Sequence, residues 1–121
     1  MIEIGKPHGI NNMITVNIDE LIIGTCLPTE WRKGTALFNK KDSMALLNLC
    51  SEKNIAILSI EGFIKNGDCI VPDMNCIIDF SEFLKNSNTS EMNNSINITR
   101  DFILHYENND ILIEFLLVRF N

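Results

Sequence analysis

The side chains in this sequence best suited to chemistry are the carboxylates that gather in its middle third. Closely spaced carboxylates can transfer protons, hold a hard divalent cation, or present a negative surface to a basic partner. They are Glu61, Asp68, Asp73, Asp79 and Glu82. The spacings of six and three residues between Asp73, Asp79 and Glu82 match no calcium-binding loop, so we predict no metal site. A solvated acidic rim and a docking surface for a basic partner both remain open.

The sequence lacks the motifs on which most enzyme sites are built. It contains no Gly-x-Ser-x-Gly elbow, no phosphate-binding loop, no His-Glu-x-x-His and no dinucleotide-binding fingerprint. Its two histidines are His8, beside a glycine near the N-terminus, and His105, within a helical pattern. We therefore expect no catalytic residue, no cofactor and no enzyme activity.

The four cysteines are far apart in the chain and form no Cys-x-x-Cys pair. They are Cys26, Cys50, Cys69 and Cys76. This pattern favours reduced, partly buried thiols in a cytosolic protein over a disulfide or a metal site. The first nine residues lack the apolar core of a signal peptide, and no apolar run approaches the roughly 20 residues that span a bilayer. We therefore expect a cytoplasmic protein with no membrane partner.

The net charge of −6 is unevenly distributed along the chain. Residues 1–53 hold six acidic and six basic residues, whereas residues 54–121 hold ten acidic and four basic ones. Such a field disfavours direct binding to nucleic acid and favours a cationic partner. The same charge would also keep an ordinary small domain in solution, so the charge alone does not indicate a function.

The elements that must position these carboxylates follow from periodicity. At 121 residues the chain fits one domain. Alternating or continuous apolar residues predict strands at 13–18, 55–60 and 111–120, the last two inside the sheet. Helical spacing predicts one helix beginning at Asp42 or Ser43 and another at 96–107. We expect a single small α+β domain over 1–121, a mostly antiparallel sheet of about four to six strands with two main helices packed on it. Residues 1–12 are expected to be an irregular lead-in and the polar stretch 85–95 a mobile loop.

Asn66 and Gly67 predict a hairpin in the middle of the acidic stretch. A two-residue turn there would pair residues 63–65 with 68–70 and place Lys65 opposite Asp68. Pro72 removes a backbone donor, so we expect regular pairing to end there and a short strand to follow at 76–78. Trp31, the single tryptophan, is suited either to anchoring the core or to meeting a partner.

Several short motifs in this region resemble a known family. Trp31 precedes a leucine-rich helix containing Ala45 and Leu46. Residues 54–58 (NIAIL) are followed by Glu61-Gly62-Phe63, then by residues 71–74 (VPDM) and 77–81 (IIDFS). Over residues 29–83 the chain is similar to the bacterial immunity proteins found beside polymorphic toxins, and within them to the family numbered forty.

The resemblance implies a cytoplasmic antidote, in one setting part of a contact-dependent growth inhibition module, that binds one cognate toxin domain without catalysis or cofactor. It supplies no set of toxin-binding residues. The charge argument and the interface preference of tryptophan give the hypothesis that the toxin, expected to be a basic nuclease, is bound by Glu61, Asp68, Asp73, Asp79, Glu82 and Trp31. Gly62 and Asp73 could equally be structural, for backbone freedom and for capping a turn. The alternative is a small-molecule-binding or regulatory α+β domain with no toxin partner, and a monomer or a homodimer fits either function.

Overall fold

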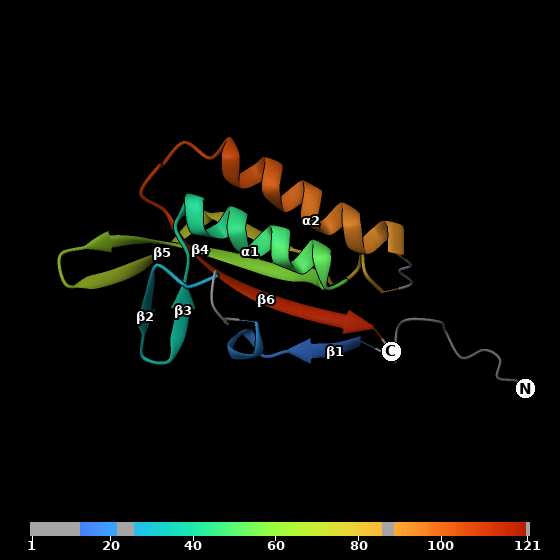
Figure 1. Ribbon diagram of the computed structural model, residues 1–121. Coiled ribbons are helices and arrows are strands. Elements are labelled where there is room, and N and C mark those ends of the chain that lie inside the picture. Colours follow the sequence, from blue (N-terminus) through green and yellow to red (C-terminus); the bar gives the residue numbers. More distant parts are fainter. Residues whose placement is uncertain (1–12, 22–25, 86–88, 121) are drawn as a thin grey trace, which may run out of the picture.

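The chain folds as an antiparallel sheet that carries two helices on one face, as the computed structural model of residues 13–21, 26–85 and 89–120 shows (Figure 1). In chain order the elements are β1 (Met13–Val16), the 3-10 turn η1 (Ile18–Glu20), β2 (Glu30–Arg32), β3 (Thr35–Leu37), α1 (Lys40–Glu52), β4 (Ala56–Asn66), β5 (Cys69–Asp79), α2 (Thr89–Leu104) and β6 (Leu112–Phe120). Four strands form one sheet in the order β1-β6-β4-β5, and β2 and β3 form a separate hairpin. The predicted α+β class is confirmed. The predicted lead-in at 1–12 lies outside the described residues.

The two strands predicted to be interior, β4 and β6, occupy the centre of the sheet. β4 lies between β5 and β6, and β6 lies between β1 and β4. Ala56 and Ile57 at the start of β4 are fully buried, as are Ile113 and Leu117 in β6. The strand order therefore confirms the interior positions predicted for both strands.

The β4–β5 hairpin turns where the sequence predicted, but its register differs. Asn66 pairs with Cys69 and Lys65 with Ile70, so Gly67 and Asp68 form the loop. Gly67 has φ = 65° and occupies the first loop position. A hairpin turn of the Gly-X kind needs a positive φ at that position, where glycine carries no steric penalty. The expected pairing of Lys65 with Asp68 is therefore wrong.

Pro72 does not end the pairing of β5 with β4. It pairs with Phe63, and β5 continues to Asp79. Because β5 lies at an edge of the sheet, a residue without a backbone N–H is tolerated there. The irregularity comes later, since Gly62 pairs with Asp73 whereas Glu61 pairs with Ile77. The residues between them form a bulge that bends the strand.

α1 begins earlier than predicted. Its N-cap is Asn39, whose side chain accepts a hydrogen bond from the backbone N–H of Asp42 (2.8 Å). Asp42 and Ser43 therefore lie inside the first turn and do not cap it. Ser43 is buried, and its hydroxyl lies 3.4 Å from the carbonyl oxygen of Phe38.

α2 begins at Thr89, so the mobile loop predicted at 85–95 is wrong from residue 89 onward. The buried side chains of this helix follow helical spacing and are those of Met92, Ser95, Ile96, Thr99 and Ile103. Two of them are polar, which concealed the apolar stripe in the sequence. Ser95 is satisfied, since its hydroxyl donates to the carbonyl of Met92 (2.7 Å) and accepts from the N–H of Ile57 (3.1 Å). Thr99 Oγ1 is buried and has no hydrogen-bond partner among the described residues.

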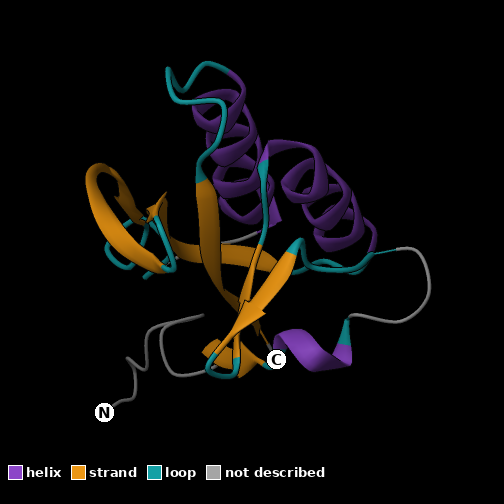
Figure 2. Cartoon of the chain, turned by 90° about the vertical axis from the view of Figure 1, so that its left-hand side faces the viewer, coloured by secondary structure: helices purple, strands orange, loops and turns teal. Residues whose placement is uncertain are grey.

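The helices and the sheet enclose one apolar core. Figure 2 shows both helices on the same side of the strands. The rings of Phe38 and Phe115 meet edge to face with centroids 5.7 Å apart. Three of the four cysteines are buried, Cys69 is exposed, and all four are free. Burial raises the pKa of the Cys50 thiol to about 12 and that of Cys76 to about 11. Neither described helix is long and apolar enough to cross a bilayer.

Candidate protein-binding surface

The sheet has two unlike faces. The helices cover one of them, and the β2–β3 hairpin lies on the other side (Figure 1). In β6, Ile113, Phe115 and Leu117 are buried, whereas Glu114 and Leu116 point to the opposite face because side chains alternate along a strand. Paired residues of neighbouring strands share a face. The opposite face therefore carries, in two adjacent cross-strand rows, Ile77, Glu61 and Glu114 and then Asp79, Ser59 and Leu116. We call these six residues the open face.

Two carboxylates lie directly opposite each other at the centre of the open face. Glu61 of β4 pairs with Glu114 of β6. Like charges in this arrangement are destabilising by roughly 0.2–1 kcal/mol. Partial burial, and secondarily the charge of Glu61, raises the pKa of Glu114. Within the described residues no ion pair involves either carboxylate. The fold thus keeps an unneutralised negative site on an otherwise regular sheet.

Large apolar side chains adjoin these carboxylates. Ile77 is 42% exposed beside Glu61, and Leu116 is 48% exposed between Glu114 and the end of β6. Asp79 adds a third carboxylate in the row of Leu116. Exposed apolar side chains among charged ones are typical of surfaces that meet another protein.

Asp79 and Glu82 already have local partners. The carboxylate of Asp79 accepts hydrogen bonds from the backbone N–H (2.8 Å) and the hydroxyl of Ser81. These bonds hold the pKa of Asp79 below its usual range. Glu82 lies in the turn after β5 and pairs with Lys85 at 3.2 Å. Of these two, only Asp79 belongs to the open face.

Asp73 lies on the helix side of the sheet, away from Glu61. It accepts a hydrogen bond from the hydroxyl of Tyr106, which follows α2. Burial, together with this bond to Asp73, raises the pKa of Tyr106. The other oxygen of Asp73 accepts from the backbone N–H of Asn75 at 3.1 Å, as a turn-capping aspartate does. The hydrogen bond between Asp73 and Tyr106 therefore links the bulge of β5 to the segment after α2.

Trp31 and Asp68 belong to the region of the β2–β3 hairpin. Trp31 is 49% exposed, so it does not anchor the core, and its partner-facing role stays a prediction. The carbonyl oxygen of Asp68 accepts a hydrogen bond from Arg32 at 2.7 Å. Glu30 binds Lys65 (2.8 Å) and Arg32 (2.7 Å), and these bonds lower the pKa of Glu30. The Glu30–Lys65 ion pair and the Arg32–Asp68 hydrogen bond tie the hairpin to the β4–β5 turn, whereas the Glu30–Arg32 ion pair lies within β2.

Glu114 separates two hollows on this side of the molecule. One, the hairpin cleft, has a volume of about 400 Å³ and lies between the β2–β3 hairpin and the sheet, with Leu37, Phe63 and Arg32 on its walls. The other, the edge hollow, has a volume of about 380 Å³ and lies between the end of β1, the β2–β3 turn and β6. Glu114 lines both.

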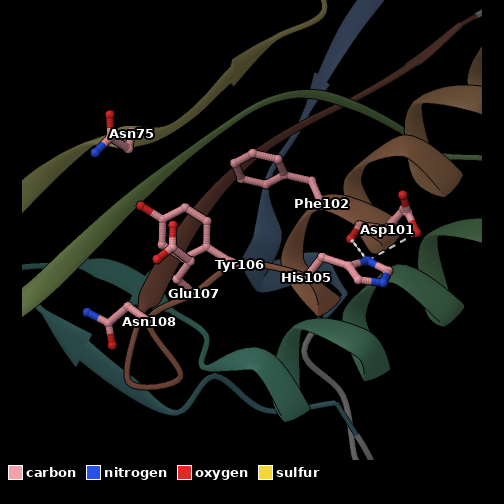
Figure 3. A pocket seen from close by; sticks show the side chains of 7 residues that line it. All are labelled: Asn75, Asp101, Phe102, His105, Tyr106, Glu107 and Asn108. Atoms are coloured by element: carbon pink, nitrogen blue, oxygen red, sulfur yellow. Dashed lines mark hydrogen bonds and ion pairs between the residues drawn. The ribbon is translucent and has the colours of Figure 1, made fainter.

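A third hollow, of about 470 Å³, lies between the end of α2 and the bulge of β5 (Figure 3). Its polar groups are largely engaged with one another. His105 lies 3.3 Å from the carboxylate of Asp101, and the ring nitrogen Nδ1 is 2.9 Å from the backbone oxygen of Asp101. The Tyr106 hydroxyl is held by Asp73. This arrangement stabilises the end of the helix and contrasts with the unneutralised pair on the open face.

The sequence analysis missed Glu114. Glu114 is the one acidic residue in the apolar run 111–120, and this could have identified it, because an ionisable group in such a strand must face solvent or a partner. Among residues 13–21, 26–85 and 89–120, no three His, Cys, Asp or Glu side chains gather in a way that would hold a metal ion.

Comparison of the chain with models of protein families, with curated proteins and with solved structures found no match.

Proposed function

We propose that this chain is a cytoplasmic immunity protein that binds one cognate bacterial toxin domain and neutralises it stoichiometrically, without catalysis or cofactor. The observation that carries the proposal is the open face. There, Glu61 and Glu114 oppose each other and form no ion pair within the part of the chain that the structure describes, beside the exposed side chains of Ile77 and Leu116. The motif resemblance over residues 29–83 points to the same class of protein.

The negative charge of the open face favours a basic partner, and we propose a nuclease. A cation placed between the two glutamates would relieve their repulsion and replace the water that each loses on binding. The excess of acidic residues in the second part of the chain would steer such a partner from a distance. An inhibitor that competes with a nucleic-acid substrate gains from that steering, since association must be fast.

Co-expression with the toxin domain encoded immediately upstream tests the proposal. We expect growth to be rescued and the two proteins to co-purify in equal amounts. Glu61→Gln/Glu114→Gln should weaken the complex, whereas Glu52→Gln/Glu107→Gln, which removes the same charge from exposed positions outside the open face, should not. Absence of both complex and rescue with the native chain would contradict the proposal.

The hairpin cleft supports the alternative of a small-molecule-binding domain. Its walls combine apolar Leu37, Phe63 and Ile70 with the polar groups of Arg32 and Glu114, and its volume lies within the range of roughly 300–1,000 Å³ usual for ligand sites. Under this alternative a metabolite would raise the midpoint of thermal unfolding, and Phe63→Ala would abolish that rise. A toxin complex whose affinity is unchanged by Phe63→Ala would argue against the cleft as the functional site.

A further inference from the structure

The edge of β6 that faces β1 is interrupted at Phe115. On one side of the interruption Ile113 exchanges both backbone hydrogen bonds with Phe38 (2.9 and 2.8 Å), and on the other Leu117 pairs with Val16. Backbone N–H and C=O groups of alternate residues point to the same edge of an antiparallel strand. Phe115 therefore directs its N–H and C=O into the interruption. Among the described residues neither β1 nor β3 pairs with it there.

The edge hollow lies at this interruption. The pairing of β1 with β6 ends at Val16, before the 3-10 turn. β3 pairs with β2, and Phe38, which follows β3, forms the bridge to Ile113 of β6. The β2–β3 turn closes the third side, with positive φ angles of 51° at Lys33 and 83° at Gly34. Two successive positive φ angles are what a tight hairpin turn of type I′ requires, so the wall next to Thr35 is held rigidly.

The polar groups that line the edge hollow include several that can accept hydrogen bonds. Glu114 is the one charged side chain that lines it among the described residues. Thr15 and Thr35, whose hydroxyls can accept hydrogen bonds, and Phe115 also line it. Leu116 supplies an exposed apolar wall. A guanidinium carries five N–H donors, no acceptor and a permanent charge, and it is attached to an apolar stem.

We propose that the edge hollow binds the guanidinium of one arginine side chain presented by the partner, with its head on the Glu114 carboxylate and the Phe115 carbonyl and its stem against Leu116. The identity of the partner rests on the proposed function. The binding can be tested without the partner. An isolated arginine side chain should bind weakly in the edge hollow, and a neutral side chain of the same shape should not.

The test uses N-acetyl-arginine amide, with N-acetyl-citrulline amide as the uncharged control of nearly identical shape. We expect the arginine compound to shift the amide resonances of Thr15, Gly34 and Phe115 in a saturable way and the citrulline compound to leave them unchanged. Glu114→Gln should weaken binding at least tenfold, and the matched Glu52→Gln variant should bind normally. Equal shifts with both compounds, no saturable shift at these residues, or native binding by Glu114→Gln would each overturn the inference.

Failure of this inference is separable from failure of the proposed function. A toxin complex that forms normally with Glu114→Gln overturns the arginine site and leaves the immunity function standing. Binding of the arginine compound by a chain that forms no toxin complex supports the hollow as a guanidinium site and contradicts the immunity function.

Discussion

The two faces of the sheet use acidic residues in opposite ways. On the helix side the Asp73 carboxylate accepts hydrogen bonds from the Tyr106 hydroxyl and from the backbone N–H of Asn75, so both of its oxygens have partners within the fold. On the open face Glu61 and Glu114 oppose each other, and within the described residues neither takes part in an ion pair. Carboxylates of one sheet are thus engaged within the fold on one face and left without an ion pair among the described residues on the other. Variants on the helix side should therefore change stability, and variants on the open face should change binding.

The largest stability effect is expected at Gly62, which follows Glu61 in β4 and faces the helix side. A Cβ atom there would lie 2.5 Å from Cβ and Sγ of Cys76 and 2.9 Å from Cδ1 of Ile111. Close approach, and not a positive φ, is therefore the reason for glycine. Gly62→Ala should destabilise the fold by about 2–3 kcal/mol in urea unfolding. Ser59→Ala, on the open side of the same strand, is the control. A Gly62→Ala variant of native stability would show that the packing of β4 against β5 is looser than described.

The bond between Tyr106 and Asp73 should contribute the next largest amount. Tyr106→Phe is expected to lower the free energy of unfolding by about 1–2 kcal/mol, because the Asp73 carboxylate loses its phenol donor. Asp73→Asn combined with Tyr106→Phe should cost less than the sum of the two changes. Toxin association should stay unchanged in Tyr106→Phe. A slower association in this variant would place Asp73 in the interface and remove the distinction between the faces.

On the helix side, a substitution at Thr99 is expected to raise the stability of the fold, in contrast to the two changes above. Its hydroxyl is buried and finds no partner in the part of the chain that the structure describes, so Thr99→Val should stabilise the protein by about 1 kcal/mol. Ser95→Ala is the matched variant, and it should destabilise, because the Ser95 hydroxyl accepts from Ile57 and donates to Met92. Thermal unfolding of both variants checks the pair. Destabilisation by Thr99→Val would mean that the hydroxyl has a partner in solution.

Glu114→Gln should raise stability slightly at neutral pH, by a few tenths to about 1 kcal/mol after allowance for solvent screening. The pKa of Glu114 is raised in the fold, so its ionised form costs stability. The native protein recovers this amount as the pH falls through the raised pKa toward the ordinary glutamate value of about 4.3. The difference between variant and native chain should therefore vanish in acid. A difference that persists below about pH 4 would indicate that the amide changes packing and not charge.

Much of the architecture followed from the sequence because it depends on local apolar patterns. The interior strands and the hairpin near Asn66 are of this kind. The start of α2 was missed because Ser95 and Thr99 fill buried positions that pattern reading assigns to apolar residues. The hairpin register was missed because the turn uses Gly67 at its first position, which only the three-dimensional pairing reveals.

The candidate site was only partly foreseeable. Glu61 and Asp79 were named from the sequence and do lie on the open face. Asp73 was named with them but points to the other side, because the bulge of β5 changes the alternation between Asp73 and Ile77. Glu114 was not named, since it is distant in sequence and meets Glu61 only through strand pairing. Charge content along a chain cannot show which carboxylates share a face.

Stopped-flow association with the upstream-encoded toxin domain, measured at low and at high salt, bears most closely on the role of the open face. Glu61→Gln/Glu114→Gln should slow association at least tenfold at low salt and much less at high salt, because screening removes long-range attraction. Glu52→Gln/Glu107→Gln, with the same loss of charge, should change it little. Equal rates for the native chain and the Glu61→Gln/Glu114→Gln variant would contradict the assignment of the open face as the toxin-binding surface.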